Sequence, residues 1–256
     1  MPFQRRLFAL RRTQNLLAGC IFDRLACQKC FCVTFAESNK GSPQAVEWKG
    51  SDFIQRTISA MVGKGSVNHN SRKFKAENVN ADRSHLNIDY CNENIKKVYH
   101  ELFDEALERY NDKQTRADRR IDDYYEKIRN SKQEKPFHEL ILQIGDKENM
   151  SAESENGQLA RQILDEYYRG FQERNPYLKV FSAHLHLDEA TPHLHIDFVP
   201  FTRGSKRGLD TRVSLKQALA AQGFKGGSRG NTEWSQWVQS EKEQLACVME
   251  RYGIEW

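Results

Sequence analysis

Four histidines occupy alternating positions in two short segments of the chain, His184 and His186 in LKVFSAHLHL and His193 and His195 in PHLHIDFVP. Their alternation with apolar residues predicts two half-buried strands, each with an apolar side and a histidine-bearing side. Antiparallel pairing across the short loop between the segments would set His186 opposite His193. His184 would then lie opposite His195, so that all four imidazoles share one face. Imidazoles at these separations can bind one metal ion, with metal–nitrogen bonds of about 2 Å.

Three of these imidazoles suffice for a metal site, and we favour His186, His193 and His195. The loop between the segments adds Asp188 and Glu189, either as a carboxylate ligand or as acceptors that orient the ligands. Such a set leaves one coordination position open for a phosphate oxygen. Imidazole suits Mn²⁺ and Zn²⁺ while Mg²⁺ prefers oxygen, so the pattern predicts a divalent ion without choosing among Mn, Mg and Zn. The alternative, histidines on a polar strand face with no ion, is disfavoured by four of them in one hairpin beside two carboxylates.

The elements that must position this hairpin alternate along the chain. Apolar, β-branched runs that end at glycine or proline predict further strands at 53–63 and 137–145. Apolar residues at three- and four-residue spacing, together with start and stop signals, predict helices. The predicted helices cover 94–112, 116–135, 158–174, 214–222 and the residues from 232 onward. The charge run within 116–135 is typical of a solvated helix face rather than of a DNA clamp.

Composition limits the class of protein. The 256 residues suffice for one large domain, and the mean hydropathy of −0.78, with 29% charged residues, is typical of a soluble chain. No stretch reaches the roughly 18 consecutive apolar residues that a membrane span requires, so we expect no stable membrane insertion. The net charge of +4 is too small to establish a nucleic-acid partner. The six cysteines are expected to be reduced.

The chain is expected to divide into three parts. Residues 1–53 are interpreted as a poorly ordered or spurious extension, because arginines interrupt the apolar run before Cys20 and no second pair follows the Cys27/Cys30 motif. Residues 54–231 would form the catalytic domain. Residues 232–256 would form a C-terminal helix at the start of a tail that continues beyond this sequence.

The segment HLDEATPHLH, residues 186–195, resembles the third motif of the Mob/Pre family of plasmid mobilisation and plasmid recombination relaxases. That motif reads His-x-Asp-Glu-x-x-Pro-His-x-His, and every fixed position is present. NHNSR at 68–72 is similar to the first motif of the family, and RSHLN at 83–87 is similar to the second. The resemblance implies an α+β fold of the His-hydrophobe-His endonuclease type. Its antiparallel β-sheet has helices packed on one face and the metal site on the open sheet face.

The resemblance also implies an activity. Relaxases of this family cut one strand of plasmid DNA at a transfer origin, stay linked to the 5′ phosphate and later reseal the strand, in conjugative mobilisation and plasmid recombination. The attacking group would be the neutral imidazole of His69. Arg72 could contact the same phosphate bidentately, and Glu189 would complete the catalytic set. Tyr90 is a rival nucleophile, because tyrosine has that role in other relaxase families, although a packing or base-stacking role is the alternative.

The expected partners are single-stranded or supercoiled plasmid DNA at the transfer origin and the conjugation coupling machinery, in the bacterial cytoplasm. A homodimer would form through the missing C-terminal tail. The DNA contacts are expected from polar and basic side chains in the motifs and in the glycine-bearing stretch after the hairpin. They are Asn70, Asn87, Tyr90, Arg203, Lys206, Arg207 and Arg212. Trp234 and Trp237 could stack on bases or fill a core.

Two other functions fit the same residues. One is a metal-dependent phosphodiesterase that activates water and forms no covalent intermediate. The other is a non-catalytic DNA-binding module in which the histidines hold a structural ion. A protein–DNA adduct that resists denaturation separates the relaxase from both.

Overall fold

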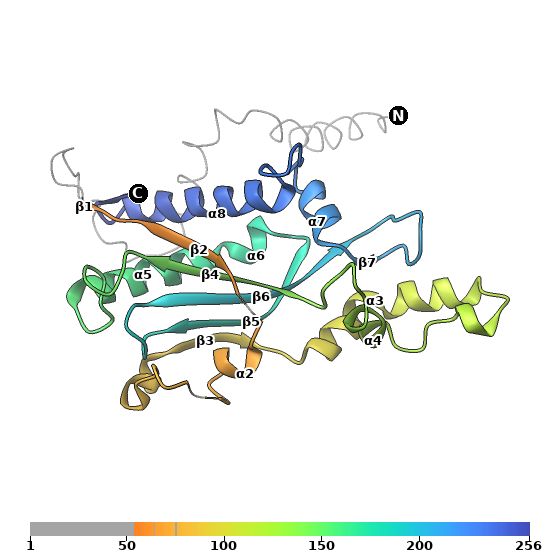
Figure 1. Ribbon diagram of the computed structural model, residues 1–256, viewed down its shortest axis with the longest axis horizontal. Coiled ribbons are helices and arrows are strands. Elements are labelled where there is room, and N and C mark those ends of the chain that lie inside the picture. The colour runs from red at the N-terminus through yellow and green to blue at the C-terminus, as the bar shows by residue number, and fades with distance from the viewer. Residues whose placement is uncertain (1–53, 64, 75) are drawn as a thin grey trace, which may run out of the picture. The chain divides into compact units, whose positions relative to one another are not determined.

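The computed structural model describes residues 54–63, 65–74 and 76–256, and the expectations for residues 1–53, the Cys27/Cys30 motif included, lie outside the described residues. A six-stranded sheet forms the centre, with the order β2-β4-β6-β5-β3 and with β7 paired to β6 (Figure 1). All of its pairings are antiparallel. The strands are β2 (Ile58–Val62), β3 (Ile88–Asn92), β4 (His138–Ile144), β5 (Leu178–His186), β6 (His193–Thr202) and β7 (Arg212–Val213). A separate parallel pair joins β1 (Ile54–Gln55) to β8 (Ile254–Glu255).

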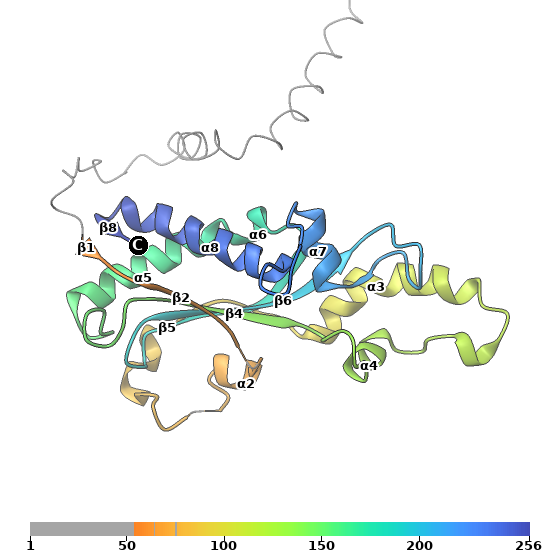
Figure 2. The ribbon, with the colours of Figure 1, turned by 45° about the horizontal axis from the view of Figure 1, so that its top comes forward.

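Helices cover one face of this sheet (Figure 2). They are α5 (Glu155–Arg169), α6 (Phe171–Arg174), α7 (Leu215–Ala221) and α8 (Glu233–Glu250). Alternate strand residues such as Leu142, Leu185 and Ile196 fill the layer between sheet and helices and are fully buried. This arrangement confirms the predicted α+β class. No helix of the described part of the chain has both the length and the apolar character that a membrane crossing requires.

The C-terminal helix α8 belongs to the core of the same domain. Trp237 has no exposed surface, and its indole nitrogen donates to Asn175 Oδ1 at 2.7 Å. Leu245 and Met249 are equally buried. The boundary expected at residue 231 is therefore not a boundary in the structure, because the apolar face of this helix closes the core.

The opposite face of the sheet carries shorter elements. The helical turn α2 (Val67–Asn70) and a 3₁₀ helix (Ala81–Leu86) lie beneath the sheet in Figure 2. Towards the far end of β6, α3 (Ile95–Asp112) and α4 (Tyr124–Arg129) pack on each other around a second apolar cluster.

The helix predicted over 116–135 is wrong in extent. Only α4 and a 3₁₀ turn (Ala117–Arg119) form within this stretch. The Asp123 side chain accepts a hydrogen bond from Glu126 N and so begins the helix at Tyr124. Three side chains, those of Ile121, Tyr124 and Ile128, are buried there, so packing stabilises little more than these turns.

The central hairpin has the predicted register. His186 lies opposite His193 and His184 opposite His195. The alternation fails at one position, because a bulge between Val180 and Ser182 places Phe181 in the second apolar cluster rather than beside Ala183.

Candidate active site

The structure brings three imidazoles of the hairpin together. The side chains of His186, His193 and His195 offer ring nitrogens that lie within 4.8 Å of one another. The three residues are 1%, 9% and 5% exposed, so the histidine face is more deeply covered than a half-buried strand would be. The cover is supplied by α2, whose Asn70 carbonyl contacts His186. Sequence alternation could not show this cover, because it comes from a segment more than 100 residues away.

In each of the three rings, one nitrogen has a hydrogen-bond partner in the protein. The other nitrogen belongs to the group of atoms that could bind an ion. His195 Nδ1 lies 2.6 Å from Glu139 Oε1, His186 Nε2 lies 2.8 Å from Asn70 O, and His193 Nδ1 lies 2.8 Å from Thr191 O. The buried His186 Nδ1 and His195 Nε2 have no hydrogen-bond partner. Unpartnered buried nitrogens are costly unless a ligand satisfies them, so this donor set fits a divalent metal ion.

His184 stays outside this group although it shares the same sheet face. Its Nδ1 lies 2.6 Å from Asp89 Oδ1 and its Nε2 lies 3.2 Å from Ser182 Oγ, so neither nitrogen is free. The choice of three histidines from the four agrees with the group that the geometry selects.

The ring nitrogens are electrostatically suited to ligation. Burial, followed by the neighbouring His195 and His193, lowers the pKa of His186 to about 2. Burial also lowers the pKa of His193. Both imidazoles are therefore neutral at neutral pH, which metal coordination requires.

Glu139 is the site residue that sequence reasoning missed. It is 3% exposed near the start of β4, where its Oε1 accepts from His195 and from Asn70 Nδ2, the latter at 2.7 Å. Its Oε2 accepts from Gly65 N at 2.8 Å. Burial opposes ionisation of this carboxyl, but the hydrogen bonds from His195 and Gly65 outweigh burial and lower its pKa. A glutamate among the apolar residues of the strand predicted at 137–145 was the available signal.

Asn70 bridges two buried carboxylates rather than facing DNA. It is 1% exposed, and its Nδ2 donates to Glu139 and, at 3.0 Å, to Asp197 Oδ2. Burial and the nearby Glu139 raise the pKa of Asp197 to about 6. This burial and pairing favour a positioning role for Asn70 over the predicted DNA contact.

Asp188 ties the hairpin loop to the two upstream motifs. It is fully buried and accepts hydrogen bonds from Arg72, Ser84 and Asn87. Burial raises its pKa, but these donors outweigh burial and hold the pKa at about 2. Asn87 also accepts from Leu187 N at 2.7 Å, so its side chain helps to position the hairpin loop.

Arg72 is paired within the protein. Its Nε and Nη2 contact both oxygens of Asp188, and Nη2 donates to Glu189 Oε1 at 2.8 Å. Its backbone φ of 55° turns the chain back after α2 and directs the guanidinium toward the hairpin loop. The expected bidentate contact to a phosphate does not fit this pairing, because the fork is already occupied.

His69 lies at the mouth of the three-histidine group. Its ring centroid is 6.2 Å from that of His186 and 6.3 Å from that of His195, and its side chain is 23% exposed. Its Nε2 is 3.6 Å from Glu189 Oε1, and that oxygen is 3.8 Å from His193 Nε2. Burial and the adjacent Arg72 lower the pKa of His69, so its imidazole is neutral at neutral pH.

Tyr90 lies on the other side of the sheet. Its hydroxyl donates to Asp165 Oδ1 at 2.9 Å, and its ring packs on Tyr168 with centroids 4.1 Å apart, both partners belonging to α5. Burial and the bond to Asp165 raise its pKa. The sheet therefore separates Tyr90 from His69, which favours the packing role for Tyr90 over a role as nucleophile or DNA contact.

The basic stretch after the hairpin lies at the far end of β6. His193 begins this strand and Thr202 ends it, a separation of about 30 Å at 3.3 Å per residue. Arg203, Lys206, Arg207 and Arg212 follow that end. Arg212 is partly engaged, with its Nε donating to Ser205 Oγ at 3.0 Å. These residues do not join the histidine site.

Trp237 is fully buried and Trp234 is partly buried, and both belong to the core beneath the helices. Trp234 and Trp237 pack together on the helix-covered side, with ring centroids 4.9 Å apart and Phe198 beside both.

Comparisons with known proteins identify a family for this chain. The sequence pattern of the plasmid recombination enzyme family, Mob_Pre, matches residues 64–223. Among solved structures, the chain is similar to a Mn-bound MobM relaxase domain (MOBV; Mob_Pre) in complex with plasmid pMV158 oriT DNA, with 24% identity, a TM-score of 0.42 and coverage of 77% of this chain and 88% of that one. A second MobM complex with a longer oriT strand gives 21% identity, a TM-score of 0.39 and coverage of 79% and 87%. No curated protein matched the chain.

Proposed function

Because the chain belongs to the plasmid recombination enzyme family, Mob_Pre, we propose that its histidine site nicks one strand of plasmid DNA and holds the cut end covalently. The substrate would be single-stranded or supercoiled DNA at a transfer origin. The linked strand would then pass to conjugation coupling machinery or be resealed, in the bacterial cytoplasm.

The position of His69 carries this proposal. A neutral, partly exposed imidazole lies beside a group of three buried imidazoles whose free nitrogens converge. A purely structural ion would need the three histidines and one further ligand, which Glu189 could supply, and it would not need His69 beside them. A nucleophile must lie beside the three histidines, because the phosphate that it attacks must also contact the ion.

His186, His193 and His195 would hold the divalent ion through Nδ1, Nε2 and Nε2 respectively. When bound, the ion would neutralise charge on a phosphate oxygen and so favour attack at phosphorus. Glu139 and the Asn70 carbonyl would fix the tautomer and the orientation of two of these rings.

In the chemical step, His69 Nε2 would form a bond to phosphorus while the bond from phosphorus to the 3′ oxygen breaks. The 3′ oxygen takes a proton from solvent and leaves as a hydroxyl, and the imidazole loses its remaining proton. The product is a phosphoramidate link to the 5′ phosphate, and attack by a 3′ hydroxyl reverses the step. Glu189 Oε1 lies 3.6 Å from Nε2 and would orient the ring, or serve as a fourth ligand.

Arg72 would position this machinery rather than touch DNA. It holds Asp188 and Glu189 together, and Asp188 in turn anchors the loop that joins two ligands of the proposed ion. The pairing neutralises charge next to the proposed phosphate position.

The test is covalent capture. Supercoiled plasmid with the cognate origin is incubated with Mn²⁺, Mg²⁺ or Zn²⁺, denatured, and examined for a protein–DNA adduct. The full chain should form the adduct with at least one ion, and His69→Ala should not, while the exposed His100→Ala serves as a matched control. Nicking without adduct would instead identify a phosphodiesterase that uses water. DNA binding with metal bound but without nicking would identify a non-catalytic module.

A further inference from the structure

We propose that a cleft next to α2 binds one unstacked nucleotide of the DNA strand, with its base on Phe137, a few nucleotides from the bond that is cut. The inference deepens the proposed function, on which it rests. Its ligand class is a nucleobase with its attached phosphate.

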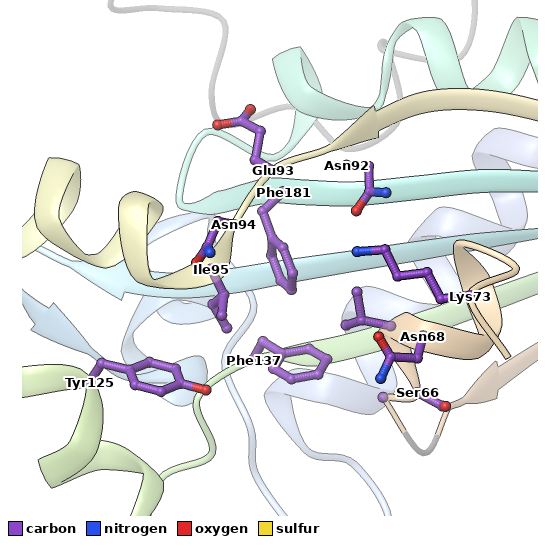
Figure 3. Close-up of a pocket in the computed structure, with 12 residues that line it drawn as sticks. Ser66, Asn68, Lys73, Asn92, Glu93, Asn94, Ile95, Tyr125, Phe137 and Phe181 are labelled. Carbon is purple, nitrogen blue, oxygen red and sulfur yellow. The ribbon is translucent and has the colours of Figure 1, made fainter.

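The cleft has a volume of about 560 Å³, which accommodates a nucleotide. It lies between α2, the end of β3 and the start of α3 (Figure 3). Asn68 lines it and immediately precedes His69 in α2. Asn92 lines it from β3 and lies opposite Ser182, which is four residues before His186 and therefore about 13 Å from it along β5. The cleft and the histidines thus share one sheet face at a distance that a short stretch of strand spans.

The floor of the cleft is aromatic. Phe181, which the bulge in β5 turns to this face, is 1% exposed and holds Phe137 edge to face at 5.3 Å between centroids. Phe137 is itself only half-buried, so part of its ring faces the cleft (Figure 3). A fixed ring with one open side is a stacking surface for a base, and stacking tolerates any base because each has a π-face.

The rim supplies groups that recognise bases and phosphate. The side chains of Asn68, Asn92 and Lys73 are exposed, and none has a hydrogen bond or ion pair with another described residue. Amide side chains donate to and accept from base edges, and a lysine attracts phosphate. The carboxylate of Glu93 points away from the cleft in Figure 3 and is paired with Lys179 at 3.9 Å. The inner rim therefore carries a positive charge without an opposing one.

The experiment compares two single strands of about 12 nucleotides, one of thymidylate and one of abasic deoxyribose phosphate, each labelled with fluorescein. Kd is measured by anisotropy with the full chain in the absence of divalent ions, so that no covalent step intervenes. The ratio of the abasic Kd to the thymidylate Kd isolates the contribution of the bases. We expect a ratio of roughly ten or more for the wild type.

Phe137→Leu keeps apolar packing on Phe181 but removes the aromatic face, and should lower this ratio by about five-fold. Asn92→Ala changes an exposed side chain that the fold does not need, and should lower the ratio by about three-fold. Phe224→Leu, on the helix-covered side, is the matched control and should leave the ratio unchanged.

A wild-type ratio near one, or a ratio that neither Phe137→Leu nor Asn92→Ala changes, would overturn the inference. Its failure is separable from failure of the proposed function. If the wild type forms the adduct but neither variant changes the Kd ratio, only the inference about the cleft fails. If the variants lower the Kd ratio but the wild type forms no adduct, only the proposed nicking chemistry fails.

Discussion

Replacing Glu139 by glutamine should weaken metal binding while the histidines remain in place. The carboxylate accepts three hydrogen bonds, from His195 Nδ1 at 2.6 Å, Asn70 Nδ2 at 2.7 Å and Gly65 N at 2.8 Å. A glutamine has one acceptor oxygen and one donor group. If its oxygen keeps His195 and Asn70, its NH₂ faces the Gly65 N–H, and two donors then oppose each other. The substitution also removes the negative charge that makes His195 a stronger ligand.

The expected loss of Mn²⁺ affinity is about 10- to 100-fold, or about 1.4 to 2.8 kcal/mol. The unsatisfied Gly65 N–H should in addition cost about 1 to 3 kcal/mol of folding free energy. Isothermal titration with Mn²⁺ measures the first quantity and urea unfolding of the metal-free protein measures the second. Glu153→Gln is the matched control, because Glu153 is 69% exposed and 3.9 Å from Arg83. A Glu139→Gln variant that binds Mn²⁺ within about two-fold of wild type would refute the view that this carboxylate tunes the site.

Four further outcomes are expected. His69→Ala should abolish the adduct with unchanged Mn²⁺ affinity, whereas His193→Ala should lower both, as titration and denaturing gels would show. Tyr90→Phe should leave adduct yield unchanged and cost about 1 kcal/mol in urea unfolding, and loss of the adduct would contradict the assignment of His69. Lys206→Ala, if its loop contacts DNA, should reduce the slope of log Kd against log salt by about one, while an unchanged slope argues against that contact. Burial and the adjacent Lys135 lower the pKa of His138 from 6.5 to about 4. Between pH 6.5 and pH 4 the unfolded chain therefore binds a proton at His138 that the folded chain does not bind, and the free energy of unfolding falls as the pH drops through this range. The stability advantage of His138→Phe over wild type in urea should therefore grow by about 2 kcal/mol between pH 7 and pH 5, and a constant difference would exclude that burial effect.

Local sequence patterns are sufficient to predict an element whose structure depends mainly on its own residues. Helix α3 follows from apolar residues at three- and four-residue spacing, and β4 from an apolar run that ends at Gly145. The stretch 116–135 was predicted too long, because helix periodicity without a broad buried face does not stabilise a helix. Local patterns do not predict the turn α2 either, since four residues give no measurable period.

The hairpin and its group of three histidines follow from the sequence alone, because the two strands adjoin in the chain and period-two alternation assigns their faces without knowledge of other elements. The groups that surround those histidines come from distant parts of the chain and depend on the packing of the whole domain. Glu139 reaches His195 because β4 pairs with β6, and Arg72 reaches Asp188 across 116 residues of chain. Tyr90 is kept from the site by the sheet itself, since its side chain lies on the face that α5 covers. Strand order and bulges arise from contacts between distant segments, and no local pattern in the chain encodes them.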